Sequence, residues 1–126
     1  MSEMTQEIRE HLEAVILPFW KGLIDQQNGG YAGVVGYDLA ADFSAVKGCI
    51  LNSRILWFFS QATMTLHDDA LLPYAHHAYA MLCRMIDPRN GGVYWSMNAD
   101  GTVCDSTKHT YNHAFAIYAL SAYAKA

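Results

Sequence analysis

Two copies of one unit run through the sequence, and this internal repeat limits the possible folds more than any other feature. The segment 25–31, which contains Asn-Gly-Gly, returns in similar form as the segment 87–93, 62 positions further on. Lys47 and Lys108 keep nearly the same spacing, 61 positions. Self-similarity at a fixed period is the signature of a repeated supersecondary unit, so we predict two such units.

Each unit begins with the pattern of an amphipathic helix. Apolar residues recur every three or four positions over residues 8–19 and again over 71–86. Pro18 should kink or end the first of these helices near Leu17, because proline lacks a backbone N–H. We expect both helices to be outer helices, with one face in water.

A glycine-rich segment and a second helix complete each unit. Residues 30–37 and 92–97 alternate in polarity next to turn residues, which indicates two irregular β-hairpins. The following segments are helical and almost free of charge: Arg54 is the one charged residue in 48–66, and 109–124 contains no Lys, Arg, Asp or Glu. A helix that is apolar on all sides is expected to be an inner, buried helix. The fold class predicted is all-α: helix pairs with hairpin loops between outer and inner helices.

Two helix pairs are too few to cover their own apolar faces. We place the repeats at about residues 5–66 and 68–126, so that residues 1–126 form a single, partial domain. Inner helices need neighbours on both flanks, and two repeats leave apolar faces exposed. The chain is therefore predicted to be the N-terminal piece of a longer protein, or to self-associate through its inner helices.

Composition excludes several other classes of protein. With 126 residues, 52% of them hydrophobic and 16% charged, the chain can bury a core. The net charge of −4 argues against a nucleic-acid partner, and no uninterrupted apolar stretch is long enough to predict a membrane span. The acidic N-terminus has no signal core, and three cysteines without a C-x-x-C pair favour reduced, buried thiols in a cytoplasmic protein. No nucleotide-binding motif is present, and we predict no cofactor.

Arg54 is the first candidate for a functional role. Its helical neighbours at three and four positions are all apolar: Ile50, Leu51, Trp57 and Phe58. A guanidinium in such surroundings needs a charged partner or a ligand. The alternative to a ligand is a structural ion pair with an aspartate of another helix.

The second inner helix begins with an unusually polar segment, residues 108–113. Both inner helices follow a hairpin, so their first turns should lie on the same rim of the bundle. Tyr111, Asn112 and His109 could there form hydrogen bonds with sugar hydroxyls, and Trp57 could offer its face to a sugar ring. The alternative for each of them is helix capping or a buried hydrogen bond.

Three further residues have the spacing of metal ligands. Asp105, His109 and His113 are spaced four residues apart, which can align three ligands on one helical face. Asp105 precedes the expected helix, however, and histidines four residues apart are common by chance. We predict no metal.

Several segments together resemble the N-terminal part of the N-acylglucosamine 2-epimerase family, in particular its members that act on disaccharides. They are residues 18–20, 28–31, 47–60, 91–95 and 108–120. Members of this family are (α/α)₆ barrels with six inner and six outer helices. The resemblance implies that the two units here are about a third of such a ring.

The resemblance also implies a reaction. Members invert C2 at the reducing end of β-1,4-linked disaccharides such as cellobiose or lactose, through a cis-enediolate and without a cofactor, with two histidines exchanging the proton. Arg54 matches the family's pocket arginine, which binds substrate oxygens and stabilises the enediolate. Tyr111 matches a tyrosine that contacts the sugar. The family's catalytic histidines lie on later helices, so the chain alone is predicted to be inactive.

Two other functions remain open at this stage. One is a different reaction within the same family, as an N-acylglucosamine 2-epimerase or an aldose–ketose isomerase. The other is a non-catalytic helical module that self-associates. Comparing cellobiose with N-acetylmannosamine as substrates separates the enzymes, and a stable oligomer without sugar binding would favour the module.

Overall fold

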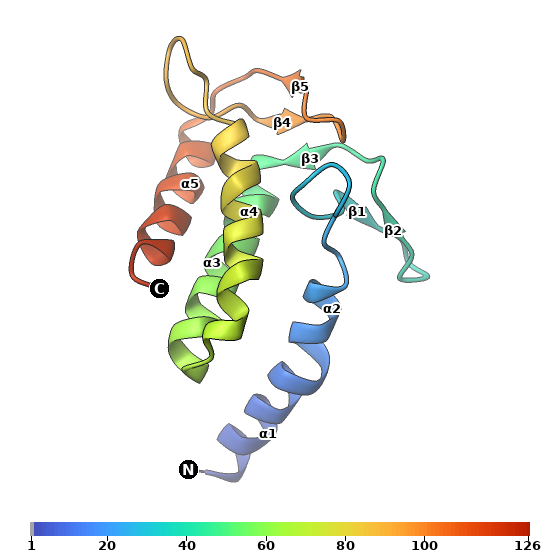
Figure 1. Ribbon diagram of the computed structural model, residues 1–126, viewed down its shortest axis with the longest axis vertical. Helices are drawn as coiled ribbons and strands as arrows, with labels where there is room; N and C mark the ends of the chain where they lie inside the picture. Colours follow the sequence, from blue (N-terminus) through green and yellow to red (C-terminus); the bar gives the residue numbers. More distant parts are fainter. Residues whose placement is uncertain (1) are drawn as a thin grey trace.

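Helices form most of the computed structural model, which describes residues 2–126 (Figure 1). The main helices are α1 (Glu3–His11), α2 (Leu17–Lys21), α3 (Cys49–Leu66), α4 (Leu72–Arg84) and α5 (Thr110–Tyr123), with a π-helical turn at Leu12–Ile16 and a 3₁₀ turn at Asp69–Leu71. The strands are β1 (Val34–Val35), β2 (Ala41–Asp42), β3 (Lys47–Gly48), β4 (Ser96–Met97) and β5 (Val103–Asp105). None of the helices within residues 2–126 is long and apolar enough to cross a membrane.

Of the two outcomes predicted near Leu17, a kink or an end of the helix, the end does not occur: the first outer helix continues through Pro18, after a π-helical turn. The π-helical turn between α1 and α2 lets the N–H of Leu17 donate to the carbonyl of Leu12, five residues earlier. Pro18, which has no N–H to donate, then falls in the first turn of α2, where none is needed. The π-helical turn therefore lets the helix continue through the proline.

The core lies around α3, which packs against α4 on one side and α5 on the other (Figure 1). Leu56 and Phe59 of α3 have no exposed surface. The hydroxyls of Ser60 and Thr63 are also buried and donate to carbonyls one turn earlier on the same helix. This apolar inner helix is therefore buried where α4 and α5 pack on it, but not on all sides as predicted, because Arg54 is exposed. The buried Oδ1 of Asn52 has no hydrogen-bond partner within the described residues.

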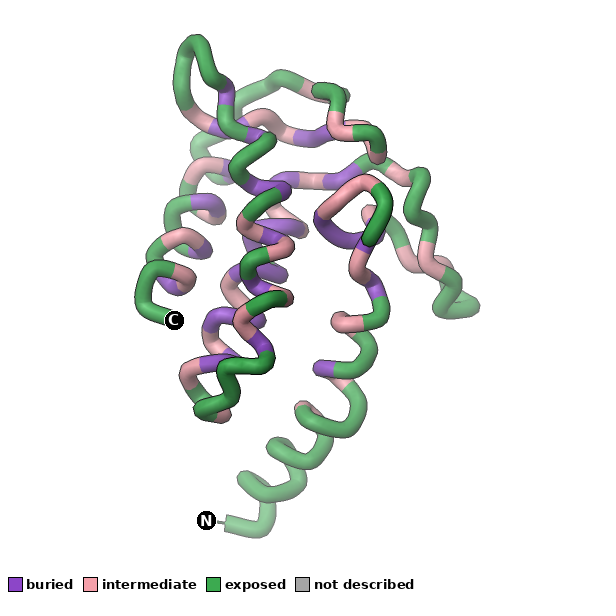
Figure 2. Tube along the Cα trace, in the orientation of Figure 1, coloured by how far each residue is buried: buried purple, intermediate pink, exposed green. Residues whose placement is uncertain are grey.

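The second inner helix differs, because only one of its flanks is covered. On α5, the side chains of Tyr111, Ile117 and Tyr118 are 62%, 65% and 51% exposed. The prediction that it would be buried on all sides is wrong for residues 2–126, since α3 is the main helix packed on it. On the outer helix α1, Ile8 is 63% exposed, and Figure 2 shows α1 exposed along its length.

The strands gather at the end of the bundle where α3 and α5 begin (Figure 1). β1 pairs with β2 in an antiparallel hairpin. β3, which directly precedes α3 in the first repeat, pairs with β4 of the second, and β4 pairs with β5. This pairing across the repeats was not predicted. Together with the N–H of Cys49, which donates to the carbonyl of Trp95, it joins the start of α3 to the second repeat.

A buried ion pair ties the first repeat together. The ammonium of Lys47 lies 2.6 Å from a carboxylate oxygen of Asp25 and 2.6 Å from the carbonyl oxygen of Gly29. Lys47 has no exposed surface, and Asp25 is 3% exposed. The other carboxylate oxygen accepts from the backbone N–H groups of Gln27 and Asn28. Two of the three ammonium N–H groups and both carboxylate oxygens thus have hydrogen-bond partners inside the protein, which offsets the cost of burying the two charges.

The second repeat makes the same contacts. The ammonium of Lys108 bonds to the carboxylate of Asp87 and, at 2.7 Å, to the carbonyl of Gly91. Here the lysine side chain is 29% exposed. The two repeats therefore share a turn, an ion pair and a carbonyl acceptor at matching positions, with the second copy closer to solvent.

The cysteines depart from the sequence prediction. All three are free, but only Cys49 is buried, whereas Cys83 and Cys104 are exposed. Burial raises the pKa of the Cys49 thiol, so this residue is an inert core side chain.

Acid should weaken the fold through the first ion pair. Burial alone would raise the pKa of Asp25, but the Lys47 ammonium and the N–H groups of Asn28 lower it to about 2, from 3.8. The pair thus contributes stability above about pH 4 that is lost as the pH falls towards 2. In urea unfolding from pH 6 to pH 2, the double variant Asp25→Asn/Lys47→Met should lose about 2 kcal/mol less than the unmodified chain. Equal losses in both proteins would contradict this assignment.

Candidate functional site

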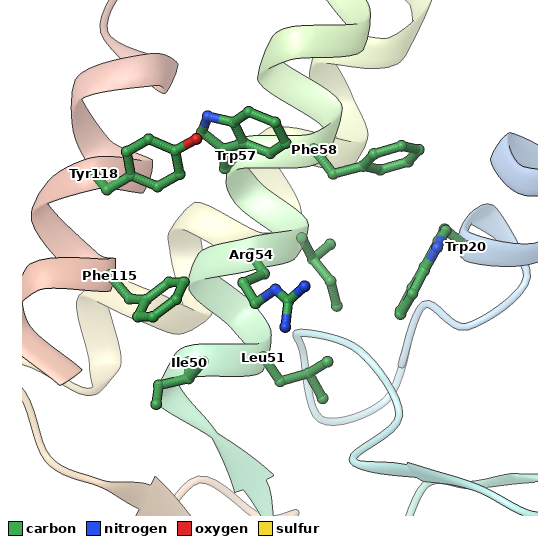
Figure 3. Close-up of a pocket in the computed structure, with 9 residues that line it drawn as sticks. Trp20, Ile50, Leu51, Arg54, Trp57, Phe58, Phe115 and Tyr118 are labelled. Carbon is green, nitrogen blue, oxygen red and sulfur yellow. The ribbon is translucent and has the colours of Figure 1, made fainter. Parts of the chain in front are cut away.

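A hollow of about 790 Å³ opens between α3, α5 and α2 (Figure 3). Its walls are apolar and aromatic, apart from one guanidinium and one phenol hydroxyl. The lining residues are Trp20, Ile50, Leu51, Arg54, Ile55, Trp57, Phe58, Phe115 and Tyr118. A concave apolar surface with few polar groups is typical of a site for a small molecule.

The two inner helices present equivalent positions of the repeat to this hollow. Arg54 and Phe115 are 61 positions apart, and so are Trp57 and Tyr118. The rings of Trp57 and Tyr118 stack with their centroids 5.4 Å apart and their planes 19° from parallel. The hollow is therefore a seam between two equivalent helix faces, with a stacked aromatic pair across it.

Arg54 is the charged group of the site. Figure 3 shows it between Phe115 and Trp20, with its guanidinium directed into the hollow. Within residues 2–126 its side chain makes no hydrogen bond and no ion pair. The structural ion pair considered from the sequence is thus not formed inside the described chain.

Tyr111 lies beside the hollow rather than in its wall. It is on the first turn of α5, 62% exposed, and its ring meets the edge of Phe115 at a centroid distance of 5.0 Å. Because Phe115 lines the hollow, the phenol of Tyr111 stands one helical turn along the same face. Of the predicted residues, the structure therefore brings Arg54 and Trp57 together, with Tyr111 next to them.

Asn112 and His109 lie elsewhere. Asn112 has no exposed surface, and its amide donates to the carbonyl of Tyr94 at 2.8 Å. His109 occupies the N-cap position of α5 without a side-chain capping hydrogen bond, and its ring packs against Trp95 with centroids 4.7 Å apart. Neither residue lines the hollow. The alternative of a buried hydrogen bond describes the contact of Asn112.

His113 uses both of its ring nitrogens within the protein. Nδ1 lies 2.7 Å from the carbonyl oxygen of His109, to which it donates, and Nε2 accepts from the N–H of Val93 at 3.2 Å. No group of three metal-binding side chains occurs within residues 2–126. His113 therefore fastens α5 to the glycine turn and has no nitrogen left for a metal.

Sequence reasoning did not single out four residues of the wall: Trp20, Ile55, Phe115 and Tyr118. For two of them a signal existed, since adding the repeat spacing of 61 to Arg54 and Trp57 gives Phe115 and Tyr118. Trp20 had none, because its place depends on how α2 packs against α3.

The repeated helix pairs and the hollow between their inner helices define an all-helical repeat protein with a small-molecule-sized site. The family model for N-acylglucosamine 2-epimerase (GlcNAc 2-epimerase) matches residues 29–126. The chain belongs to this family.

Individual relatives agree with this assignment. The chain is 53% identical to a cellobiose 2-epimerase of Ruminococcus albus over 124 residues, which are 98% of this chain and 32% of the relative. The crystal structure of a sugar epimerase from a ruminal bacterium matches 98% of the chain and 32% of its own, with 53% identity and a TM-score of 0.94. The cellobiose 2-epimerase of Bacillus thermoamylovorans matches 99% of the chain and 32% of its own, with 43% identity and a TM-score of 0.96. The chain thus spans about a third of the length of these relatives.

Replacement by methionine should lower the free energy of unfolding much less at Arg54 than at Arg84. Arg54 has no partner within the described chain, so Arg54→Met should change the free energy of unfolding by less than about 0.5 kcal/mol. Arg84 donates to the carbonyls of Asn28 and Asp100, so Arg84→Met should cost about 1 kcal/mol or more. Urea unfolding of both variants checks this, and a larger loss at Arg54 than at Arg84 would contradict it.

The neighbouring glycines Gly91 and Gly92 offer a matched pair for the His113 contact. Both have positive φ, 70° and 75°, so alanine at either costs about 1–2 kcal/mol in backbone strain. A Cβ at Gly92 would lie 2.3 Å from Nε2 of His113, whereas nothing lies within 4 Å of one at Gly91. Gly92→Ala should therefore lower the free energy of unfolding by about 2 kcal/mol more than Gly91→Ala. Equal losses would contradict this, because they would show that the His113 ring moves aside with no loss in the free energy of unfolding.

Proposed function

We propose that this chain is the N-terminal third of an enzyme that reversibly inverts C2 of the reducing-end sugar of β-1,4-linked disaccharides such as cellobiose. The observation that carries the proposal is Arg54, a guanidinium without a partner in the described chain, directed into an aromatic-walled hollow. The 53% identity to a cellobiose 2-epimerase supports the choice of substrate class.

The walls of the hollow suit a sugar. Aromatic rings pack against the apolar C–H faces of a pyranose, and the Tyr118 hydroxyl can form hydrogen bonds with its hydroxyls. Arg54 presents donors in a planar fork, which matches two oxygens of one substrate. In this proposal Trp57 and Tyr118 hold the sugar, Tyr111 contacts it from the rim, and Arg54 binds the oxygens at C1 and C2.

Arg54 also has a role in the chemistry that we propose. Removal of the C2 proton from the open-chain sugar places negative charge on the carbonyl oxygen of a cis-enediolate. In the described chain Arg54 is exposed and makes no hydrogen bond. We propose that the rest of the enzyme covers the hollow, since a guanidinium held in a site that excludes water stabilises such charge more than water does. Return of a proton to the opposite face of C2 then gives the epimer, with no net change in atoms or oxidation state.

The proton-transferring groups are assigned to the rest of the enzyme. The lining of the hollow contains no histidine, aspartate or glutamate, so no side chain in its wall can act as general base near neutral pH. We propose that the bases come from helices that follow this chain in the whole protein. The chain alone then binds sugar but does not exchange its C2 proton.

The same proposal accounts for the exposed apolar faces. Two helix pairs are a third of an (α/α)₆ barrel, and the next pairs of such a ring would cover the open flank of α5 and the exposed side of α1. The hairpins between outer and inner helices would lie at one rim of the barrel.

A chimera tests the function. Residues 1–126 replace the matched third of the Ruminococcus albus enzyme, and the chimera is incubated with cellobiose in D₂O. Proton NMR should show loss of the C2 proton and a new mannose-type anomeric signal. Arg54→Ala should lower kcat/KM by about a hundredfold or more, since it removes charge stabilisation in the transition state.

Two controls make the result specific. Arg89→Ala removes an exposed arginine outside the hollow and should leave kcat/KM within about twofold. The unmodified 126-residue chain by itself should show no exchange. A folded chimera without epimerase activity would overturn the proposed function, and exchange by the chain alone would overturn the assignment of the bases to the rest of the enzyme.

A further inference from the structure

Each inner helix starts two residues after a lysine that is bonded into a glycine turn. Lys47 precedes Cys49, the first residue of α3, and Lys108 precedes Thr110, the first residue of α5. Both ammonium groups bond to an aspartate and to a carbonyl of the turn in their own repeat. The start of each inner helix is thus anchored at the same place in the repeat.

The turn that receives each lysine is itself fixed. Asp87 accepts from the backbone N–H groups of Arg89 and Asn90 and from the Asn90 amide, as Asp25 does in the first repeat. A carboxylate with all these donors has little freedom to follow a moving ammonium. Any displacement along the helix axis therefore breaks charge-assisted hydrogen bonds, which are stronger than neutral ones.

The two lysines are equally far along the sequence from the two rings that stack between the inner helices. Trp57 is ten residues after Lys47, and Tyr118 is ten residues after Lys108. Their stacking across the seam, at 5.4 Å and 19°, requires that α3 and α5 keep a fixed relative height. A slip of one residue would move a ring by about 1.5 Å along the axis and turn it by about 100°.

We propose that Lys47 and Lys108 are positioning residues of the sugar site: they set the relative height of α3 and α5, and so align Arg54 with the aromatic pair. Neither lysine lines the hollow, so each acts through the helix that it anchors. The role of the hollow as a sugar site rests on the proposed function, but the effect on helix height does not.

The test uses double variants that remove a lysine–aspartate ion pair without leaving an unpaired buried charge. Asp25→Asn/Lys47→Met and Asp87→Asn/Lys108→Met each remove both charges of one pair. The amide oxygen can still accept the N–H groups of the turn, and a buried pair replaced by neutral groups need not cost stability. The control is Glu13→Gln/Arg9→Met, which removes an exposed ion pair on the first outer helix.

The readout is proton NMR of the 126-residue chain. Nuclear Overhauser effects between the rings of Trp57 and Tyr118 report their separation, and ring-current shifts report their stacking. Both ion-pair variants should weaken these effects at least about fivefold, because a slip of one residue also turns the ring by about 100° and so carries it out of the stack. The control should match the unmodified chain.

Unchanged ring contacts in a folded Asp87→Asn/Lys108→Met variant would overturn the proposal and leave the lysines a purely structural role. The Asp25–Lys47 pair is fully buried, and its removal could prevent folding. In that case the Asp87→Asn/Lys108→Met variant alone decides the test, because Lys108 is already 29% exposed. The chimera separates the two proposals: if it is inactive while the ring contacts respond as expected, the proposed function fails and the positioning role stands.

Discussion

The buried ion pair between Lys47 and Asp25 is the interaction on which the rest of the structure depends. Taking an ammonium and a carboxylate out of water costs several kcal/mol for each ion, and only complete hydrogen bonding offsets this cost. Here the carbonyl of Gly29 and the N–H groups of the same turn supply the remaining bonds. Because Lys47 stands two residues before α3, satisfying its charge also fixes where the central helix begins, and α4 and α5 both pack on that helix.

The two repeats use the same bonds in different surroundings. The first ion pair is buried, whereas the lysine of the second is 29% exposed. Several large side chains of α5 are also exposed to solvent. In stacked repeats each unit is stabilised mainly by its neighbours, so a unit at the end of a stack keeps its internal bonds and lacks external cover. The second repeat has these properties, and the exposed rings of Tyr111 and Tyr118 follow from them.

Features that depend on the hydropathy pattern can be predicted from the sequence. Features that depend on which segments pack together cannot. The absence of charge around Arg54 indicated an inner helix buried on all sides, and α3 is buried where α4 and α5 pack on it, although Arg54 is exposed. The same pattern gave the wrong result for α5, because hydropathy does not say whether a neighbouring helix is present. Asn112 shows a related limit: its polarity predicted a hydrogen bond, but only the fold shows that the partner is a backbone carbonyl rather than a ligand. For Pro18 the sequence left a kink and a helix end open, and only the fold shows that a π-helical turn lets the helix continue.

Arg54 and Arg84 show how the same side chain serves two purposes in one small structure. Arg84 lies at the end of α4 and gives its donors to carbonyls from both repeats, so its charge-assisted bonds join the two units. Arg54 stands among apolar side chains, and no group in residues 2–126 accepts its donors. Arg54 is exposed, so water can solvate its guanidinium and the chain gains little stability from it. The two arginines therefore differ in what they do for the fold: Arg84 joins the repeats, whereas Arg54 contributes a charge to the wall of the hollow.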